Sequence, residues 1–141
     1  SLPTGLSINS TSGLITGTIA NAAHNNSPFT ATVTANDGSS SASQTFTWTV
    51  NPVVTVTNPG NQTNKVGDNV NLQIQASDAK GGTLTYGATN LPGGLTINAS
   101  TGLISGTVAT GANIGSPFTV NVAATDGTFN GSQTFSWTIN P

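Results

Sequence analysis

The chain contains an internal repeat, and this repeat restricts the possible folds more than any other feature. When the sequence is shifted by 89 positions, residues 2–52 align with residues 91–141 without a gap, and 29 of the 51 aligned residues are identical. Self-similarity at a fixed period is typical of proteins built from tandem units. The sequence therefore predicts a complete repeat in residues 53–141. Residues 1–52 are predicted to be the C-terminal part of another repeat.

Apolar and polar residues alternate along both copies, as they do in half-buried β-strands. The alternation is clearest for the apolar residues Val70, Leu72, Ile74 and Ala76 and for Phe135, Trp137 and Ile139. No window has the 3.6-residue period of a helix. About seven short strands, with turns at intervals of roughly 8–12 residues, predict an all-β fold, an antiparallel β-sandwich.

The aromatic residues of these alternating segments are expected to be buried. They are Phe46, Trp48, Phe118, Phe135 and Trp137. In the first copy, Phe46 and Trp48 alternate with threonines, which predicts that their side of the strand lies on a core. The pattern leaves the position of Tyr86 open.

Charged residues make up only 4% of the chain, against about 25% in an ordinary soluble domain, and the net charge is −2. A nucleic-acid partner is not expected, because no basic patch is available to neutralise phosphates. No apolar segment approaches the ~20 residues that cross a bilayer, so membrane insertion is not expected either.

The chain has no cysteine, which excludes disulfides, thiolate metal sites and thiol catalysis. Small secreted animal domains usually depend on disulfides. A repeated, cysteine-free chain rich in Thr, Ser, Asn and Gly fits a prokaryotic protein that is extracellular or lies at the cell surface.

The residues do not form a recognisable catalytic set, so an enzyme is not expected and no catalytic or cofactor-binding residue is predicted. His24, the one histidine, lies in a polar loop. The complete repeat has neither His nor Glu, and its three acidic residues, Asp68, Asp78 and Asp126, each lie in a predicted turn. Nucleophilic or acid–base catalysis needs a pair of groups at reachable spacing.

An exposed aromatic residue could mark a sugar-binding surface, and Phe129 is the one candidate. It lies in the turn Gly127–Asn130, where the first copy has Ser40. Single exposed apolar residues are common on protein surfaces. Polysaccharide binding is therefore the weaker alternative.

One motif carries a resemblance to a known family. Both copies contain Leu-Pro-x-Gly-Leu-x-Ile-Asn-x-x-x-Gly-Leu-Ile-x-Gly-Thr, followed by Phe-Thr-x-x-Val-x-Ala-x-Asp-Gly and by Gln-Thr-Phe-x-Trp-Thr. This set resembles the bacterial "putative Ig" and dystroglycan-type cadherin-like tandem repeats. The resemblance covers residues 53–141 from end to end and implies a sandwich used as a spacer in adhesins, surface layers and large secreted enzymes.

The same resemblance implies that calcium could bind at the junction between repeats. Asp78 and Asp126 match two of the acidic turns that hold the metal in cadherin-like repeats. Lys80 occupies a position that is acidic there, and the linker Asn51–Val53 has no carboxylate. Because calcium takes six to eight oxygen ligands, no metal site is favoured, and Lys80 is predicted to pair with Asp78 or Asp126 instead.

Two hypotheses for function follow. The favoured one is a structural repeat of an extracellular fibre, stalk or adhesin, which sets length and stiffness. Its partners would be neighbouring repeats, with lateral self-assembly because few charges protect the sheet edges. The alternative is an accessory module of a secreted or surface protein that binds polysaccharide or calcium.

Overall fold

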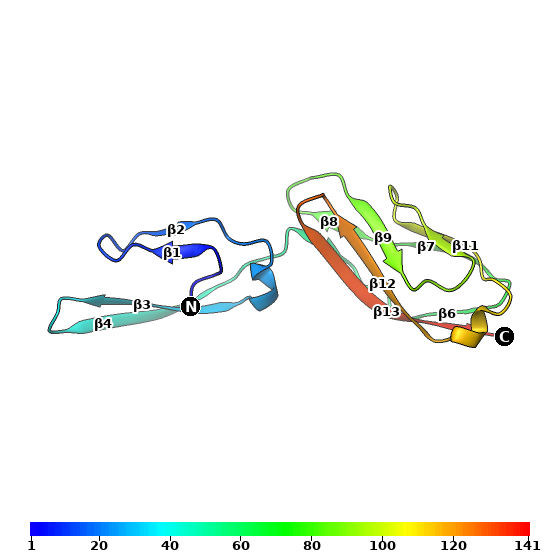
Figure 1. The fold of residues 1–141 in the computed structure, drawn as a ribbon, viewed down its shortest axis with the longest axis horizontal. Helices are drawn as coiled ribbons and strands as arrows, with labels where there is room; N and C mark the ends of the chain where they lie inside the picture. Colours follow the sequence, from blue (N-terminus) through cyan, green and yellow to red (C-terminus); the bar gives the residue numbers. More distant parts are fainter. The chain divides into compact units, whose positions relative to one another are not determined.

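The structure is a computed structural model that describes residues 1–141. The chain divides into two compact units, Ser1–Pro52 (unit 1) and Val53–Pro141 (unit 2). Both units consist of short β-strands with one four-residue 3₁₀-helix each, η1 (Ala23–Asn26) in unit 1 and η2 (Ala112–Gly115) in unit 2 (Figure 1). Neither helix is long and apolar enough to cross a membrane.

Unit 2 is a β-sandwich, which confirms the predicted all-β fold. One sheet has the strand order β6 (Gln62–Lys65), β13 (Asn130–Asn140), β12 (Phe118–Thr125) and β9 (Thr85–Thr89). The second has the order β10 (Leu95–Ile97), β11 (Leu103–Thr107) and β7 (Asn69–Gln73), and a short pair joins β5 (Val54–Val56) to β8 (Ala76–Asp78). All pairs are antiparallel except β6 with β13, which is parallel.

Two details of unit 2 differ from the sequence pattern. The apolar alternation predicts one strand through residues 69–77, but the structure divides it into β7 and β8 because the two halves have different partners, β11 and β5. The pattern also gives no sign of β6, whose sequence Gln-Thr-Asn-Lys is polar throughout. This strand forms because its backbone pairs with β13 at a sheet edge, and backbone pairing does not require apolar side chains.

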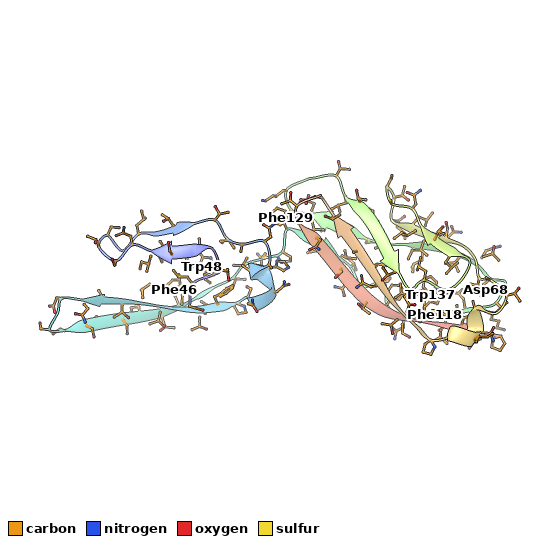
Figure 2. The ribbon with its side chains drawn as sticks, viewed as in Figure 1. Phe46, Trp48, Asp68, Phe118, Phe129 and Trp137 are labelled. Carbon is orange, nitrogen blue, oxygen red and sulfur yellow. The ribbon has the colours of Figure 1, made fainter.

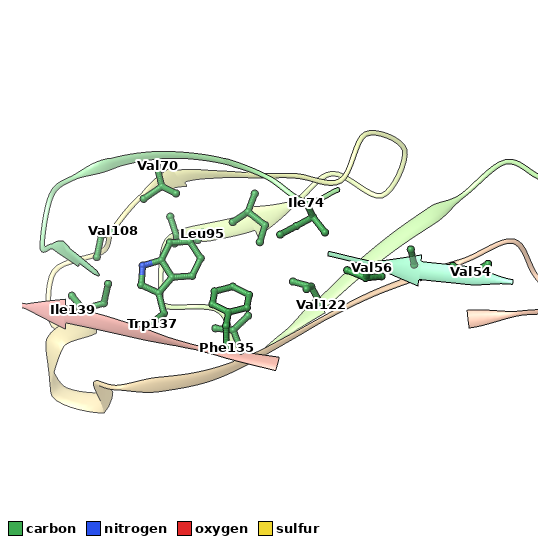
Figure 3. Close-up of a cluster of buried hydrophobic side chains, with 13 residues drawn as sticks. Val54, Val56, Val70, Ile74, Leu95, Val108, Val122, Phe135, Trp137 and Ile139 are labelled. Atoms are coloured by element: carbon green, nitrogen blue, oxygen red, sulfur yellow. The ribbon is translucent and has the colours of Figure 1, made fainter. Parts of the chain in front are cut away.

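The core of unit 2 lies between the two layers and is centred on Trp137, which has no exposed surface (Figure 3). The Phe135 ring packs beside it, with ring centroids 5.8 Å apart and planes tilted by 41°. Val70, Ile74 and Leu95 cover these rings from the opposite layer (Figure 3). A tilted pair of large aromatic rings adds packing energy beyond the area that it buries.

Unit 1 consists of two hairpins. One pairs β1 (Leu6–Ile8) with β2 (Ile15–Gly17), and the other pairs β3 (Phe29–Asn36) with β4 (Ser41–Trp48). The β1–β2 register, Leu6 with Gly17, equals the β10–β11 register, Leu95 with Gly106. The repeated motif therefore specifies the same hairpin in both units.

Two glycines of the motif are required because the backbones of the two strands come very close together at these positions. In unit 2, a Cβ atom on Gly106 would collide with the carbonyl oxygen of Gly94, and one on Gly94 would collide with the carbonyl oxygen of Thr107. Both residues also have positive φ, 137° and 90°. Gly5 and Gly17 meet the same restrictions in unit 1.

The expectation that Phe46 and Trp48 lie in a core needs correction. Phe46 is 38% exposed and Trp48 is half-buried, whereas their equivalents, Phe135 and Trp137, are 4% and 0% exposed. Unit 1 has no counterpart of the strands β5 to β9, which supply part of the core of unit 2. The strand pattern identifies the apolar side correctly, but unit 1 lacks the strand β7 that helps to cover this side in unit 2. Phe118 is also half-buried, at the margin of the unit 2 core.

Candidate functional site

Unit 2 brings Asp78 and Asp126 together, as the resemblance implies. Asp78 ends β8, and Asp126 follows β12 directly. A Cβ atom placed on Gly82 would collide with Oδ2 of Asp78 and lie 3.2 Å from Cβ of Asp126. The next residue, Ala79, donates its N–H to the carbonyl oxygen of Val53, so the two aspartates lie at the end of unit 2 where its chain begins.

Both carboxylates are already engaged by their own turns. Asp78 Oδ1 accepts the N–H of Lys80 at 2.7 Å, and Oδ2 accepts the N–H of Gly82 at 2.8 Å. Asp126 Oδ1 accepts the N–H groups of Thr128 and Phe129 at 2.8 and 2.7 Å. Aspartate side chains commonly bond the backbone two or three residues further on and so hold a turn. This role explains both residues without a ligand.

The pKa of Asp126 is lowered from its ordinary value. The hydrogen bond from the Phe129 backbone is the main cause, followed by the one from Thr128, and the side chain of Asp78 makes a smaller contribution. Hydrogen bonds to the charged form of a carboxyl group favour that form. Asp126 is therefore an ionised turn residue rather than a proton donor at neutral pH.

Lys80 does not pair with either aspartate, so that prediction is wrong. Its ammonium nitrogen lies 4.4 Å from the centroid of the Phe129 ring, and the hydrogen bond to Asp78 comes from the Lys80 backbone. A lysine over an aromatic face is held by the ring quadrupole. Phe129 is half-buried and packs against the core, so it is not the exposed sugar platform considered above. It lies at one end of unit 2 (Figure 2).

The residues at this end do not fit a calcium ion. No group of three or more His, Cys, Asp or Glu residues comes together anywhere in the chain. Two carboxylates that already accept four backbone hydrogen bonds offer few of the six to eight oxygens that calcium takes. The side chains present leave such a site short of both charge and ligands.

The other residues considered as site candidates have local structural contacts. His24 lies in the 3₁₀-helix η1 rather than in a loop. Its Nδ1 lies 2.9 Å from the carbonyl oxygen of Asn21, and since a carbonyl can only accept, the imidazole donates. Tyr86 is half-buried, and its ring covers Gly102. These contacts do not bring either residue into a pair with catalytic chemistry.

A polar network at the opposite end of unit 2 was not predicted from the sequence (Figure 2). Trp137 Nε1 donates to Oδ1 of Asn64 at 3.0 Å, and Asn64 Nδ2 donates to Oδ2 of Asp68 at 3.3 Å. The same Asp68 oxygen accepts the N–H of Lys65 at 2.8 Å. The pKa of Asp68 is lowered, first by the Lys65 backbone bond and then by Asn64.

The sequence contained one indication of this network. Trp137 is predicted to be buried, and a buried indole N–H usually needs a hydrogen-bond acceptor. The sequence did not reveal which residue supplies that acceptor. Asn64 lies 73 positions from Trp137 and in a strand without an apolar pattern.

One known protein family matches the chain twice, in agreement with the two copies of the internal repeat. The family described as "Putative Ig domain" matches residues 1–51 and again residues 52–140. A "Serine-rich adhesin for platelets" from Staphylococcus aureus strain USA300 is 34% identical over 138 residues, which is 94% of this chain and 6% of the adhesin. The chain thus spans only a small part of the curated relatives that it matches.

Solved structures with a similar fold include a cadherin and a putative glycosidase. Drosophila N-cadherin EC1-4 has a TM-score of 0.55 and 12% identity, covering 96% of this chain and 38% of the cadherin. A "putative alpha-galactosidase" from Bacteroides fragilis has a TM-score of 0.52 and 21% identity, covering 64% of this chain and 19% of the enzyme. At these identities the likeness concerns the fold alone.

These findings confirm three predictions made from the sequence. The fold is an Ig-like and cadherin-like sandwich, and the resemblance to bacterial putative-Ig and cadherin-like repeats is correct. An extracellular or cell-surface location agrees with the adhesin relatives. The family and its adhesin relatives indicate a non-enzymatic module. The chain belongs to the putative Ig domain family.

Proposed function

We propose that the chain is a structural repeat segment of a bacterial surface adhesin, in which successive sandwiches set the length and stiffness of a stalk. The observation that carries this proposal is the 34% identity to the Staphylococcus aureus adhesin across 94% of the chain. The tandem matches to the family are consistent with it. Repeat proteins in which each unit contacts its neighbours form extended structures of defined length.

In this proposal, residues 53–141 are the complete repeat and residues 1–52 are the C-terminal part of another one. The 89-residue shift and the hairpin register shared by the two units support this division. Unit 2 contains the additional strands β5 to β9. The module acts as a spacer and carries no catalytic residues.

The role in setting length can be tested with chains of one to four copies of residues 53–141. Small-angle X-ray scattering should show a maximum dimension that rises by a constant increment per copy. Dimensions that grow far more slowly with copy number would show that the copies collapse on each other and would contradict the stalk. A pull-down on insoluble polysaccharides serves as the competing assay, because retention of a single copy would favour the accessory-module hypothesis.

Self-association forms a separate part of the proposal. Charged side chains on edge strands normally prevent pairing with another chain. This chain has few of them, only two lysines and four aspartates. We expect light scattering at neutral pH to show a mass that increases with concentration. A constant monomer mass at high concentration would remove lateral association from the proposed function and leave the stalk role unaffected.

A further inference from the structure

Strand β7 lies at the end of the second sheet of unit 2 and leaves one backbone edge without a partner. Its even-numbered residues bond toward β11, as the bond from the Ile74 N–H to the Gly102 carbonyl shows. Because backbone groups alternate in direction along a strand, the N–H and C=O groups of Asn69, Asn71 and Gln73 point away from β11. None of these backbone groups forms a hydrogen bond within the chain.

Strand β5 covers only the remaining part of this edge. It pairs with β8, and the Thr57 N–H donates to the Gln75 carbonyl at 2.9 Å. Pro59 follows, which has no N–H to donate to a ladder, and the chain crosses to the other sheet as β6. The open edge at residues 69–73 therefore belongs to the complete unit 2.

The open edge has none of the residues that usually protect edge strands. Natural edge strands are commonly protected by charged side chains, especially lysine, and by proline. Residues 69–77 contain no charged residue, no proline and no glycine. Uncharged segments with alternating apolar residues and no proline are the ones that pair readily with another chain.

The other strand edges of unit 2 are less suited to pairing. β6 contains Lys65. β9 already uses the outward N–H of Tyr86 in a bond to the Ala99 carbonyl, and it is followed by Asn90, which has a φ of 59°. β5 and β10 have only three residues each. β7 therefore combines length, open backbone and the absence of charge.

The outer face of β7 is a row of amide side chains. Val70 and Ile74 point into the core (Figure 3), so Asn69, Asn71 and Gln73 lie on the opposite face, where all three are exposed. An amide group both donates and accepts hydrogen bonds. Such a row is therefore chemically complementary to a second copy of itself.

The existing bonds of two amides leave a donor on one and an acceptor on the other. Asn69 Oδ1 accepts the Thr107 hydroxyl at 2.7 Å, and Asn69 Nδ2 has no acceptor. Gln73 Nε2 donates to the carbonyls of Ile74 and Thr101 at 3.0 and 2.6 Å, and Gln73 Oε1 has no donor. Four residues along a strand span about 13 Å, so the free donor and the free acceptor cannot meet within one chain.

We infer that β7 is the self-association surface of unit 2, and that two copies of this chain pair their β7 strands antiparallel about a two-fold axis at Asn71. The inference rests on the self-association in the proposed function and names the strand that carries it. In this register, Asn71 lies opposite Asn71 of the second copy, and Asn69 lies opposite Gln73. Each outward N–H then meets an outward C=O, and Asn69 Nδ2 lies beside Gln73 Oε1.

The two-fold axis also explains why the contact would stop at a dimer. A two-fold interface uses the same surface on both copies, so pairing two β7 strands leaves no third β7 edge open. The contact joins the β10–β11–β7 sheets of the two copies into one continuous sheet. It therefore gives a side-by-side association of two chains.

Sedimentation equilibrium of the full chain measures the dissociation constant of this dimer. Asn71→Lys should weaken association by roughly tenfold or more, because the axis places the two lysines opposite each other, and like charges facing each other oppose association. Asn121→Lys is the matched control, since it makes the same change of charge on β12, which already pairs with β13 and β9. It should leave the dissociation constant unchanged.

The register can be tested by combining opposite charges at Asn71. Chains with Asn71→Lys and chains with Asn71→Asp should each stay monomeric at concentrations at which the unmodified chain dimerises. An equimolar mixture should recover the dimer, because the axis then places a lysine opposite an aspartate. No recovery in the mixture would overturn the two-fold register.

Hydrogen exchange locates the contact on the strand. The backbone amides of Asn69, Asn71 and Gln73 should exchange rapidly in the monomer and become protected as the dimer forms, because exchange requires an unbonded amide. Concentration-dependent mass without protection of these amides would overturn the assignment to β7.

Two further outcomes would contradict the proposal in different ways. Association that Asn71→Lys leaves unchanged, or that Asn121→Lys weakens equally, would overturn the β7 contact and leave the proposed self-association intact. A chain that stays monomeric at high concentration would overturn both. The stalk role, tested separately by scattering from repeated copies, would stand in either case.

Discussion

The indole N–H of Trp137 donates to Oδ1 of Asn64 across a distance of 3.0 Å, joining the centre of the core to the edge strand β6. Asn64 is held in turn by its bond to Asp68. The polar strand β6 thus depends on a buried tryptophan for its position, and the tryptophan depends on β6 for its acceptor.

Replacing Asn64 by alanine should therefore destabilise unit 2. The substitution leaves a buried donor without a partner, which costs about 1–3 kcal/mol. Urea denaturation of residues 53–141, followed by tryptophan fluorescence, measures the change. Asn71→Ala is the control, because the Asn71 side chain is exposed on β7, and it should cost less than about 0.5 kcal/mol. Equal effects of the two substitutions would contradict the role given to Asn64.

Gly102→Ala should be more damaging than an alanine at another glycine with positive φ. Gly102 has a φ of 71°, and an added Cβ atom would lie 2.7 Å from Cδ1 of the Tyr86 ring. The left-handed backbone costs about 1–2 kcal/mol with a side chain present, and forcing an extra methyl group into a packed site adds about 1–3 kcal/mol. Gly60, with a φ of 78° and open space around it, is the matched control and should show the backbone cost alone. Thermal denaturation of both variants provides the comparison.

The two units should differ when each is expressed alone. Residues 53–141 should fold, and Trp137→Ala should cost this unit about 3–5 kcal/mol. Residues 1–52 should remain unfolded, because large apolar side chains such as Ile8 and Phe46 stay exposed in this segment. Dispersed amide NMR signals from the 1–52 peptide would show this expectation to be wrong.

Unit 2 should lose stability in acid. The pKa values of Asp68 and Asp126 are lowered, mainly by hydrogen bonds from the backbone of Lys65 and Phe129. A lowered folded-state pKa gives a stabilising contribution that is complete above the unfolded value, about 3.9, and is lost as the pH falls through the folded value. The Tm of residues 53–141 should therefore be nearly constant from pH 8 to about 5 and fall below pH ~4.

The double variant Asp68→Asn with Asp126→Asn supplies the control for that experiment. It removes the two groups whose pKa is lowered, so its Tm should be lower at neutral pH and depend less on pH between about 5 and 2. An acid transition as steep as that of the unmodified protein would show that other groups control it.

Calcium should have little effect on stability. Asp78 and Asp126 supply two engaged carboxylates and no third acidic partner. The Tm of residues 53–141 should change by less than about 3 °C between millimolar calcium and a chelator, a shift worth under roughly 1 kcal/mol. A rise above about 10 °C would reveal a site completed by backbone carbonyls and water, because saturation at 100 times the Kd adds about 2.7 kcal/mol.

Local patterns in the sequence were sufficient for the strands that carry apolar side chains. Val70, Phe135 and Trp137 follow the two-residue period, so their strands and buried sides could be predicted. Gly94 and Gly106 could be recognised in the repeated motif, although the close backbone approach that requires them became visible only in the structure.

Three features of unit 2 depend on contacts between distant residues and could not be predicted from local sequence patterns. The polar strand β6, the acceptor of the Trp137 indole and the position of the Lys80 ammonium over Phe129 all depend on residues far apart in the chain. The sandwich and the apolar side of each alternating strand follow from the two-residue period of a β-strand, and the repeat follows from the self-similarity at a shift of 89 residues. All three could therefore be predicted from the sequence. The difference between the buried Phe135 and its exposed counterpart Phe46 depends on the tertiary structure, because burial requires a complete opposing layer. Strand β7, which carries Val70, contributes to that layer in unit 2 alone.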